Sequence, residues 1–251
     1  MKKIVIEALY GEYSNLYGDR GNLLYVQEKL RRAGAEVELV QTHLFDRPAF
    51  ADRPVDFLYI GPCTESQQEQ ELAHLRPYAD ALRQRMEGDA VTLATGNAFE
   101  LFGKAILCED GREIDGLGFY STTAKRFSDL RYNALCLGVS GEDKLVGFKN
   151  QLSHSFGETG SPFLTMETGT GLNPETKAEG FRRGNFIATY LLGPLLPLNP
   201  QFARSVLRQI APEAEFAPLP YEEEAYRMRL EELSRPDANK NSKLTDAFCK
   251  C

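Results

Sequence analysis

Short apolar stretches alternate with amphipathic helical patterns along the first hundred residues, and this order restricts the fold more than any other feature of the chain. Residues 2–10, KKIVIEALY, are dominated by β-branched and apolar side chains, which is typical of a strand buried on both faces. Apolar side chains then recur at helical spacing over residues 23–33, and Gly34 follows as a helix C-cap. The chain therefore opens with a strand and a covering helix.

The same alternation continues to about residue 103. Residues 35–42 and 56–62 have strand composition, and the apolar spacing over residues 72–86 predicts a helix that Pro77 kinks or shortens. Residues 90–103, AVTLATGNAFELFG, read as a strand, a sharp turn and a helix. This order predicts an α/β fold, with a mostly parallel sheet and helices on both faces.

The second half of the chain has a different pattern. Residues 110–171 contain short β-like segments separated by glycine-rich turns. We expect a strand over residues 186–194, a helix over residues 200–211 that begins with Pro200, and a charged helix over residues 221–233.

Composition excludes several classes of function. The 251 residues carry a formal net charge of −7, which argues against nucleic acid or an anionic membrane as the main partner. No apolar run reaches the roughly 18 residues that span a bilayer, and the N-terminal stretch turns polar too early for a signal peptide, so we expect a cytoplasmic protein. The five cysteines lack zinc-ligand spacing, and we expect neither a metal nor a cofactor.

Ligands of parallel α/β sheets bind where the strands end. In this chain those ends are the loops at residues 10–21, 61–68 and 95–97. We call residues 95–97, Thr-Gly-Asn, the corner, because many α/β enzymes carry their nucleophile at such a strand-to-helix turn. Here the corner offers only glycine, asparagine and a threonine hydroxyl. Alternatively, Gly96 only lets the strand and the helix approach closely.

Three further stretches, together with the corner, point to a known family. Residues 15–22 read NLYGDRGN, residues 61–70 read GPCTESQQEQ, and residues 188–200 read ATYLLGPLLPLNP. In this order they resemble the CobB/CobQ-like class I glutamine amidotransferases, and within them the GatD-type subunits of lipid II isoglutaminyl synthase. The resemblance covers about residues 3–233. It implies a flavodoxin-like α/β fold.

The domain boundaries follow from the extent of this resemblance. We expect one amidotransferase-like domain over residues 1–234. The polar remainder, residues 235–251, reads as a flexible C-terminal tail.

The resemblance also implies where catalytic residues belong. Family members carry a cysteine in a pattern like Cys-Gly-Gly-x-Gln before Leu-Gly, and anchoring this pattern on Gly103 aligns Glu100 with the glutamine and Gly96 with the cysteine. Family members read Tyr-Leu-His-Gly-Pro where this chain has Leu192 in place of the histidine. The resemblance thus predicts that both nucleophile and base are replaced. Thr95, one position earlier, offers an unactivated hydroxyl, a poor substitute without a positioned base.

Substrate contacts are implied in the same way. The loop at residues 61–68 resembles the segment that gives a backbone N–H to the oxyanion hole, but Pro62 lacks that donor and Cys63 replaces a family glycine. Arg126 lies where GatD-like proteins carry an arginine associated with substrate glutamine; its alternative is a solvated surface arginine. The residues expected to contact substrate are Arg126, Glu100, Asn97 and Gly61.

Three functions remain open from the sequence. The first is a noncatalytic subunit, a scaffold or regulator for a Mur-ligase-like partner in cell-wall precursor amidation. The second is an active amidotransferase of the lipid II isoglutaminyl synthase or cobyric-acid-synthase type, with chemistry relocated to Cys63 and His154, where imidazole would lower the thiol pKa. The third is a binding module that holds glutamine or a related amino acid in the glutamine pocket that the resemblance implies.

Overall fold

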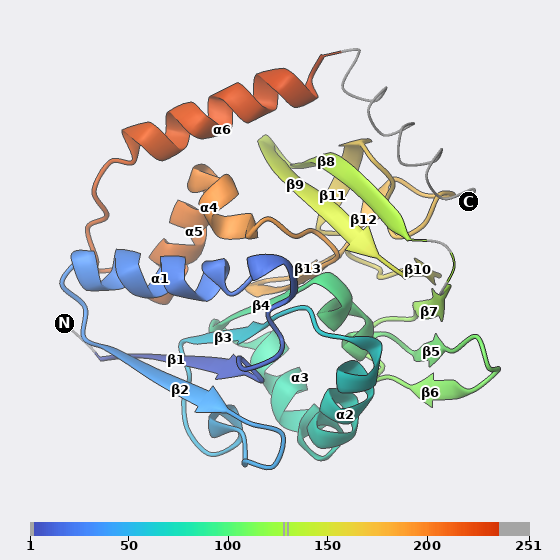
Figure 1. Cartoon of the computed structure of the whole chain (residues 1–251). Helices are drawn as coiled ribbons and strands as arrows, with labels where there is room; N and C mark the ends of the chain where they lie inside the picture. The colour runs from blue at the N-terminus through green and yellow to red at the C-terminus, as the bar shows by residue number, and fades with distance from the viewer. Residues whose placement is uncertain (1–2, 128, 130, 236–251) are drawn as a thin grey trace.

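The computed structural model describes residues 3–127, 129 and 131–235 (Figure 1). Residues 236–251, nearly all of the predicted tail, lie outside the described residues. Among the helices of the described ranges, none combines the length and the apolar character needed to cross a membrane.

The main sheet has six strands in the order β13-β14-β4-β3-β1-β2. All neighbours pair in parallel except the edge strand β13, which is antiparallel to β14. The parallel part is thus ordered as in flavodoxin-like folds, which confirms the predicted α/β class. The strands are β1 (Ile4–Leu9), β2 (Val37–Thr42), β3 (Phe57–Ile60), β4 (Val91–Thr95), β13 (Phe181–Arg183) and β14 (Phe186–Thr189).

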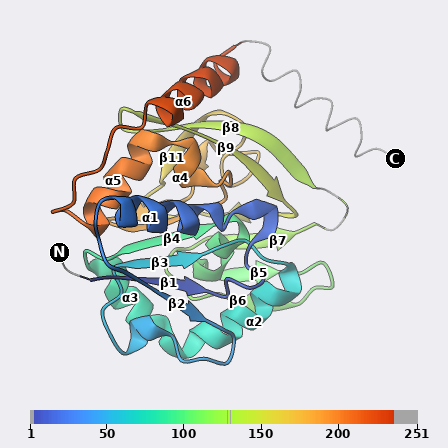
Figure 2. The ribbon, with the colours of Figure 1, turned by 60° about the vertical axis from the view of Figure 1, so that its left-hand side comes forward.

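Helices cover both faces of this sheet (Figure 2). Alternate strand residues point to opposite faces, so Phe57 and Tyr59 join the cluster under α1 and α5, whereas Leu58 and Ile60 join the cluster under α2 and α3. The first face carries α1 (Gly21–Arg32), α4 (Leu195–Leu198) and α5 (Pro200–Ile210); the second carries α2 (Glu65–Leu75) and α3 (Ala79–Glu87).

The second half of the chain forms two further four-stranded sheets, as the short β-like segments predict. One sheet has the order β10-β7-β5-β6 and the other β12-β11-β8-β9, against which α6 (Pro220–Leu233) packs. Their strands are β5 (Ala105–Leu107), β6 (Glu113–Asp115), β7 (Thr123–Arg126), β8 (Tyr132–Ser140), β9 (Asp143–Gln151), β10 (Ser153–Phe156), β11 (Leu164–Thr168) and β12 (Ala178–Glu179).

In the described part of the chain, the short 3₁₀ helices are η1 (Leu16–Gly18), η2 (Ala49–Ala51), η3 (Arg76–Tyr78) and η4 (Gly96–Phe102). The predicted break at Pro77 is confirmed, because η3 separates α2 from α3. After the corner the expected helix is the 3₁₀ helix η4. The carbonyls of Leu101 and Phe102 accept backbone hydrogen bonds from Leu117 and Phe119, which satisfies them without a longer helix.

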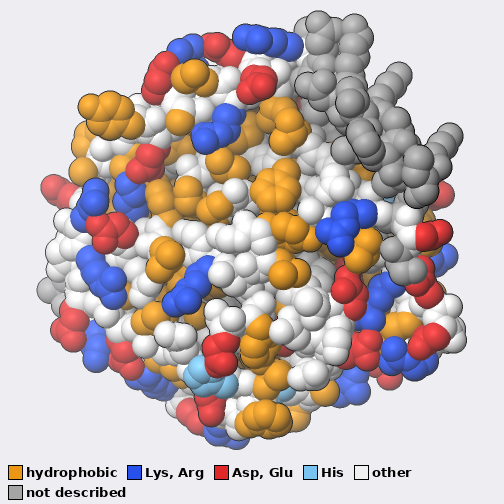
Figure 3. Space-filling model, viewed as in Figure 1, with side chains coloured by type: hydrophobic (Ala, Val, Ile, Leu, Met, Phe, Trp, Pro, Cys, Tyr) orange, Lys and Arg blue, Asp and Glu red, His pale blue; other side chains and the backbone are white. Residues whose placement is uncertain are grey.

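Charged side chains of both signs are interspersed over the face shown in Figure 3. Hydrophobic side chains gather near its centre, and the described residues drawn in colour there form no extended basic surface.

Candidate functional site

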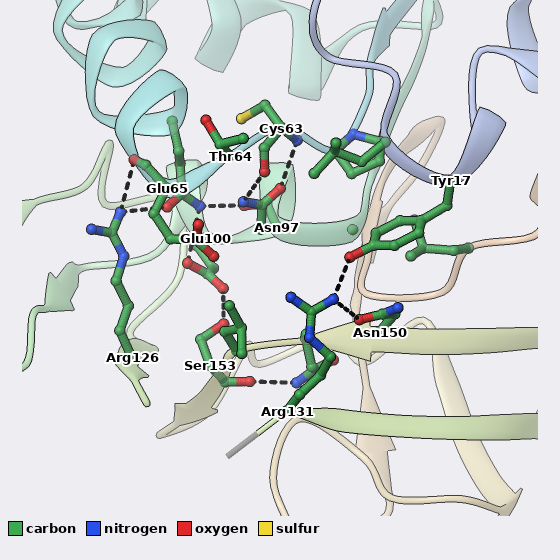
Figure 4. A pocket seen from close by; sticks show the side chains of 17 residues that line it. Tyr17, Cys63, Thr64, Glu65, Asn97, Glu100, Arg126, Arg131, Asn150 and Ser153 are labelled. Carbon is green, nitrogen blue, oxygen red and sulfur yellow. Dashed lines mark hydrogen bonds between the residues drawn. The ribbon is translucent and has the colours of Figure 1, made fainter. Parts of the chain in front are cut away.

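A cavity of about 370 Å³ lies where the parallel strands end, within the size range of small-molecule sites. The three loops that the topology predicts to meet do meet here, with Tyr17, Pro62 and Gly96 in its lining. Residues of β9 and β10 form the opposite wall (Figure 4). Of the predicted site residues, the lining includes Cys63, Gly96, Asn97, Glu100, Arg126 and Leu192; Gly61, Thr95 and His154 are not in it.

The corner leaves no room for a side chain at position 96. Gly96 follows β4 with a φ of +61°, a conformation that L-residues rarely adopt. A Cβ atom built there would lie 2.7 Å from Pro62 Cβ and 3.1 Å from Leu192 Cδ2. The two positions that the resemblance aligns with nucleophile and base are therefore neighbours, and hydrocarbon fills the space between them.

Leu192 is held to the second half of the molecule by its backbone. Its N–H donates to the Phe148 carbonyl at 2.9 Å, and the Phe148 N–H donates to the Leu192 carbonyl at 3.0 Å. The side chain is buried and can neither accept nor deliver a proton.

The Thr95 hydroxyl belongs to a buried network beneath the corner. It donates to Asp19 Oδ2, which also accepts from Tyr59 Oη at 2.8 Å and from Asn22 Nδ2 at 3.1 Å. Burial raises the pKa of the Asp19 carboxyl, and these hydrogen bonds oppose the rise. Thr95 is fully buried, so its hydroxyl is bonded to this acid instead of facing the cavity.

The Cys63 thiol has no environment that would generate a thiolate. Burial raises its pKa, and the neighbouring Glu71 raises it further. The Cys63 backbone is occupied as well: its N–H donates to Asn97 Oδ1 at 3.0 Å, and Asn97 Nδ2 donates to the Cys63 carbonyl at 2.8 Å. The Asn97 amide therefore takes up a backbone donor of the loop that the resemblance aligns with the oxyanion hole.

His154 lies on β10 and is near two aromatic rings: its ring centroid is 6.0 Å from that of Phe127 and 5.6 Å from that of Tyr132. Its Nδ1 is 3.5 Å from Gln151 Nε2, and burial lowers the pKa of the imidazole. Among the described residues, no hydrogen bond or ring contact joins His154 to Cys63. A Cys63–His154 pair thus remains a prediction without a contact to support it.

Arg126 is anchored in the wall of the cavity. It pairs with Glu69 at 2.7 Å, donates to Gln68 Oε1 at 2.8 Å, and donates to the Glu65 carbonyl at 3.2 Å. With its side chain 11% exposed, it is not a solvated surface arginine.

Glu100 lies deeper on the same side. Its carboxylate accepts from Gln68 Nε2 at 2.9 Å, from Tyr190 Oη at 3.0 Å and from Ser153 Oγ. Burial raises the pKa of this carboxyl, opposed by the hydrogen bonds from Ser153, Gln68 and Tyr190.

Gly61 allows its loop to pack closely against the loop that contains Ser14. A Cβ atom at this position would lie 2.2 Å from the Ser14 carbonyl oxygen, so only glycine lets the two loops approach this closely.

Sequence reasoning missed the wall formed by Tyr17, Arg131 and Asn150. Arg131 Nη1 donates to Asn150 Oδ1 at 3.1 Å and lies 3.5 Å from Tyr17 Oη (Figure 4). Tyr17 belongs to a loop predicted to face the site, but nothing in the sequence pattern indicates that Asn150 does. Within the described part of the chain, no three His, Cys, Asp or Glu side chains are grouped to hold a metal ion.

Two curated relatives match most of the chain. The lipid II isoglutaminyl synthase (glutamine-hydrolyzing) subunit GatD of Staphylococcus aureus (strain N315) is 28% identical over 207 residues, which cover 79% of this chain and 81% of the relative. The subunit of the same name from Streptococcus pneumoniae (strain ATCC BAA-255 / R6) is 27% identical over 205 residues, which cover 79% and 76%.

A solved structure and a family model agree with these relatives. A crystal structure of a glutamine amidotransferase superposes with a TM-score of 0.52 at 17% identity, covering 81% of this chain and 98% of that one, and supports the fold. The model of the CobB/CobQ-like glutamine amidotransferase domain matches residues 5–200. With most of its length matched in this way, the chain belongs to the CobB/CobQ-like glutamine amidotransferase family.

Proposed function

We propose that the protein is a noncatalytic amidotransferase-type subunit, which acts in the cytoplasm as a scaffold or regulator of a Mur-ligase-like partner in cell-wall precursor amidation. The observation that carries this proposal is the corner. Gly96 supplies no reactive atom, and Pro62 and Leu192 fill the space into which a side chain would extend.

Glutamine hydrolysis by a cysteine needs a nucleophile, a base and donors for the oxyanion. At the aligned positions this chain has glycine for the nucleophile and leucine for the base. The Cys63 N–H is bonded to Asn97 Oδ1, so this donor is also engaged. Members of such a catalytic unit act together, and the loss of one member alone lowers the rate by about 10⁴-fold to 10⁶-fold.

The relatives support the proposed partner. Both are subunits of a lipid II isoglutaminyl synthase, and their likeness to this chain extends over about four fifths of it. A subunit that has lost its reactive side chains but kept this fold retains the surface with which it meets a ligase.

The small-molecule module is a second candidate, favoured by the cavity. Its lining combines two arginines, Arg126 and Arg131, with two carboxylates, Glu65 and Glu100. Such a mixture suits a zwitterionic ligand.

The first test is release of glutamate and ammonia from glutamine by the purified protein, with Cys63→Ala beside it. We expect no release above a protein-free blank from either. Turnover by the wild type that is lost in Cys63→Ala would overturn the proposal, because it would show that the chemistry has moved to Cys63.

The second test concerns the partner. Co-expression with a Mur-ligase-like protein from the same genome should yield a complex on size-exclusion chromatography. The amidation catalysed by this complex should depend on added ammonia and not on glutamine. Separate elution of the two proteins, with unchanged ligase activity, would contradict the scaffold role.

A further inference from the structure

An apolar strip runs from the sheet of β8 and β9 to the rim of the cavity. Leu135 on β8 is 56% exposed and pairs with Phe148 on β9, so both side chains project from the same side of this sheet. The Phe148 ring meets the Tyr17 ring edge to face, with 6.2 Å between the ring centroids. Tyr17 is 42% exposed and lines the cavity (Figure 4). The three side chains are therefore neighbours in space, although Tyr17 is distant from the other two in sequence.

Neither the backbone nor the packing of the free chain favours tyrosine at position 17. Its φ is +63°, a left-handed conformation that is strained for most residues other than glycine. Its ring is only partly covered, so burial offsets little of this strain. Tyrosine is, by contrast, among the residue types most enriched in protein interfaces and in their energetic hot spots. The side chain at position 17 thus suits a contact that the free chain does not make.

The next turn of the chain adds a cation without a counter-ion. The Leu24 N–H donates to the Arg20 carbonyl at 3.1 Å, so the two residues lie one turn apart at the start of α1, and Leu24 is 53% exposed. Arg20 is half-buried, yet its Nε has no hydrogen-bond partner and its guanidinium forms no ion pair within the described part of the chain. Arg32, at the other end of α1, pairs with Glu28. A partly desolvated cation is unfavourable without an anion, and a carboxylate on a second protein would supply one.

From these features we infer that Tyr17, Leu24, Leu135 and Phe148, together with Arg20, form the docking surface for the ligase partner. The segment of the partner that lies on this surface presents apolar side chains to the four apolar residues and a carboxylate to Arg20. Exposed apolar side chains that gather beside polar ones are typical of protein interaction sites, whereas single exposed ones are ordinary. This inference rests on the proposed function, because it assigns the surface on which the proposed partner binds.

Affinity for the Mur-ligase-like protein from the same genome, measured by biolayer interferometry, tests the apolar part of the docking surface. Tyr17→Ala removes the ring, and Leu135→Asp places a charge beneath the docked apolar segment. We expect each variant to bind at least about 10-fold more weakly than the wild type. Both positions are exposed, so urea unfolding should show that both variants fold. Phe45→Asp, at a side chain that is 98% exposed in a different loop, is the matched control and should bind as the wild type does.

Arg20 has a separate test, because its role is electrostatic. Arg20→Glu should bind at least about 10-fold more weakly, whereas Arg20→Lys keeps the charge and should recover most of the affinity. Added salt should weaken the wild-type complex, and it should weaken the Arg20→Gln complex by a smaller factor. Lys104→Glu, an exposed charge reversal just before β5, is the control. Equal salt dependence in the wild type and Arg20→Gln would overturn the placement of a carboxylate on Arg20.

The outcomes separate this inference from the proposed function. If the wild type does not bind the ligase, the proposed function fails, and this inference fails with it. If the wild type binds and both Tyr17→Ala and Leu135→Asp bind equally well, only this inference fails. Size-exclusion chromatography of the protein alone gives a further check: a dimer that the same two variants dissociate would show that a second copy occupies the surface, which would also overturn this inference.

Discussion

Two layers of side chains meet at the corner, and they differ in chemistry. In the layer that faces the cavity, Pro62 and Leu192 surround Gly96 with hydrocarbon. The layer beneath it contains a buried acid, Asp19, that accepts hydrogen bonds from Thr95 and Tyr59. The positions aligned with the family's catalytic residues are therefore separate from the buried groups that hold the loops in place.

The physical reason is that buried polar networks must be complete. An acid beneath the surface is tolerated only while its donors are present, because each unpartnered group costs free energy in a low dielectric. The side chains of Pro62 and Leu192, in contrast, carry no polar atoms and need no such partners. A change at position 62 or 192 therefore leaves no group of the buried network without a partner.

The largest expected effect tests the lower layer. In Asp19→Ala, the Thr95 hydroxyl and the Gly193 N–H lose their acceptor, while Tyr59 and Asn22 keep only the Asp19 backbone carbonyl, and we expect a loss of about 3–4 kcal/mol in the free energy of unfolding. Urea denaturation measures this loss. Asp19→Asn, which keeps one acceptor oxygen, should lose less. A loss below about 1 kcal/mol in Asp19→Ala would show that the buried layer does not stabilise the corner as proposed.

A second prediction concerns the pH dependence of another buried acid, Glu71. Burial raises its pKa from 4.5 to about 8, opposed by hydrogen bonds from Ser14 and Cys63. The folded state then binds more protons than the unfolded state, so stability is present at acidic pH and lost as the pH rises from about 4.5 to about 8. The slope is at most about 1.4 kcal/mol per pH unit, or about 3 kcal/mol over two units.

Glu71→Gln should flatten this slope between pH 6 and 8, measured as thermal or urea unfolding at several pH values. Glu224→Gln, on the exposed part of α6, is the control and should keep the wild-type slope. Identical slopes in the wild type and Glu71→Gln would show that Glu71 does not titrate in this window.

The smallest expected effect tests the upper layer. Gly96→Ala places a Cβ atom 2.7 Å from Pro62 Cβ at a φ of +61°, and we expect a loss of about 2 kcal/mol. Adding Pro62→Gly should recover about half of this loss, because the clash is removed while the backbone strain stays. A double-mutant cycle measures the coupling. Strictly additive losses in the free energy of unfolding would mean that the side chains at positions 62 and 96 do not clash.

Much of the fold follows from the sequence because periodicity and turn residues are local signals. The parallel strands, the break at Pro77 and the meeting of three loops are all readable in this way. The form of η4 is not, because it depends on hydrogen bonds to residues 117–119.

The site is less predictable than the fold, because its contacts join segments far apart in the chain. Arg126 pairs with Glu69, which is 57 residues away, and Asn97 bonds to Cys63, which is 34 residues away. The residue types alone do not indicate these partners. The resemblance aligned Asn97 with the substrate pocket, but the bonds of its amide to the Cys63 backbone emerge only in three dimensions.

The contact between Pro62 and position 96 also bears on how such a chain changes over generations. A mutation that introduces cysteine at position 96 alone places a Cβ atom 2.7 Å from Pro62 Cβ, so this single substitution strains the corner. Substitutions at positions 62, 96 and 192 are therefore expected to be coupled, because these residues are in contact. Under the proposed noncatalytic function, the corner would therefore gain a reactive side chain only through more than one substitution.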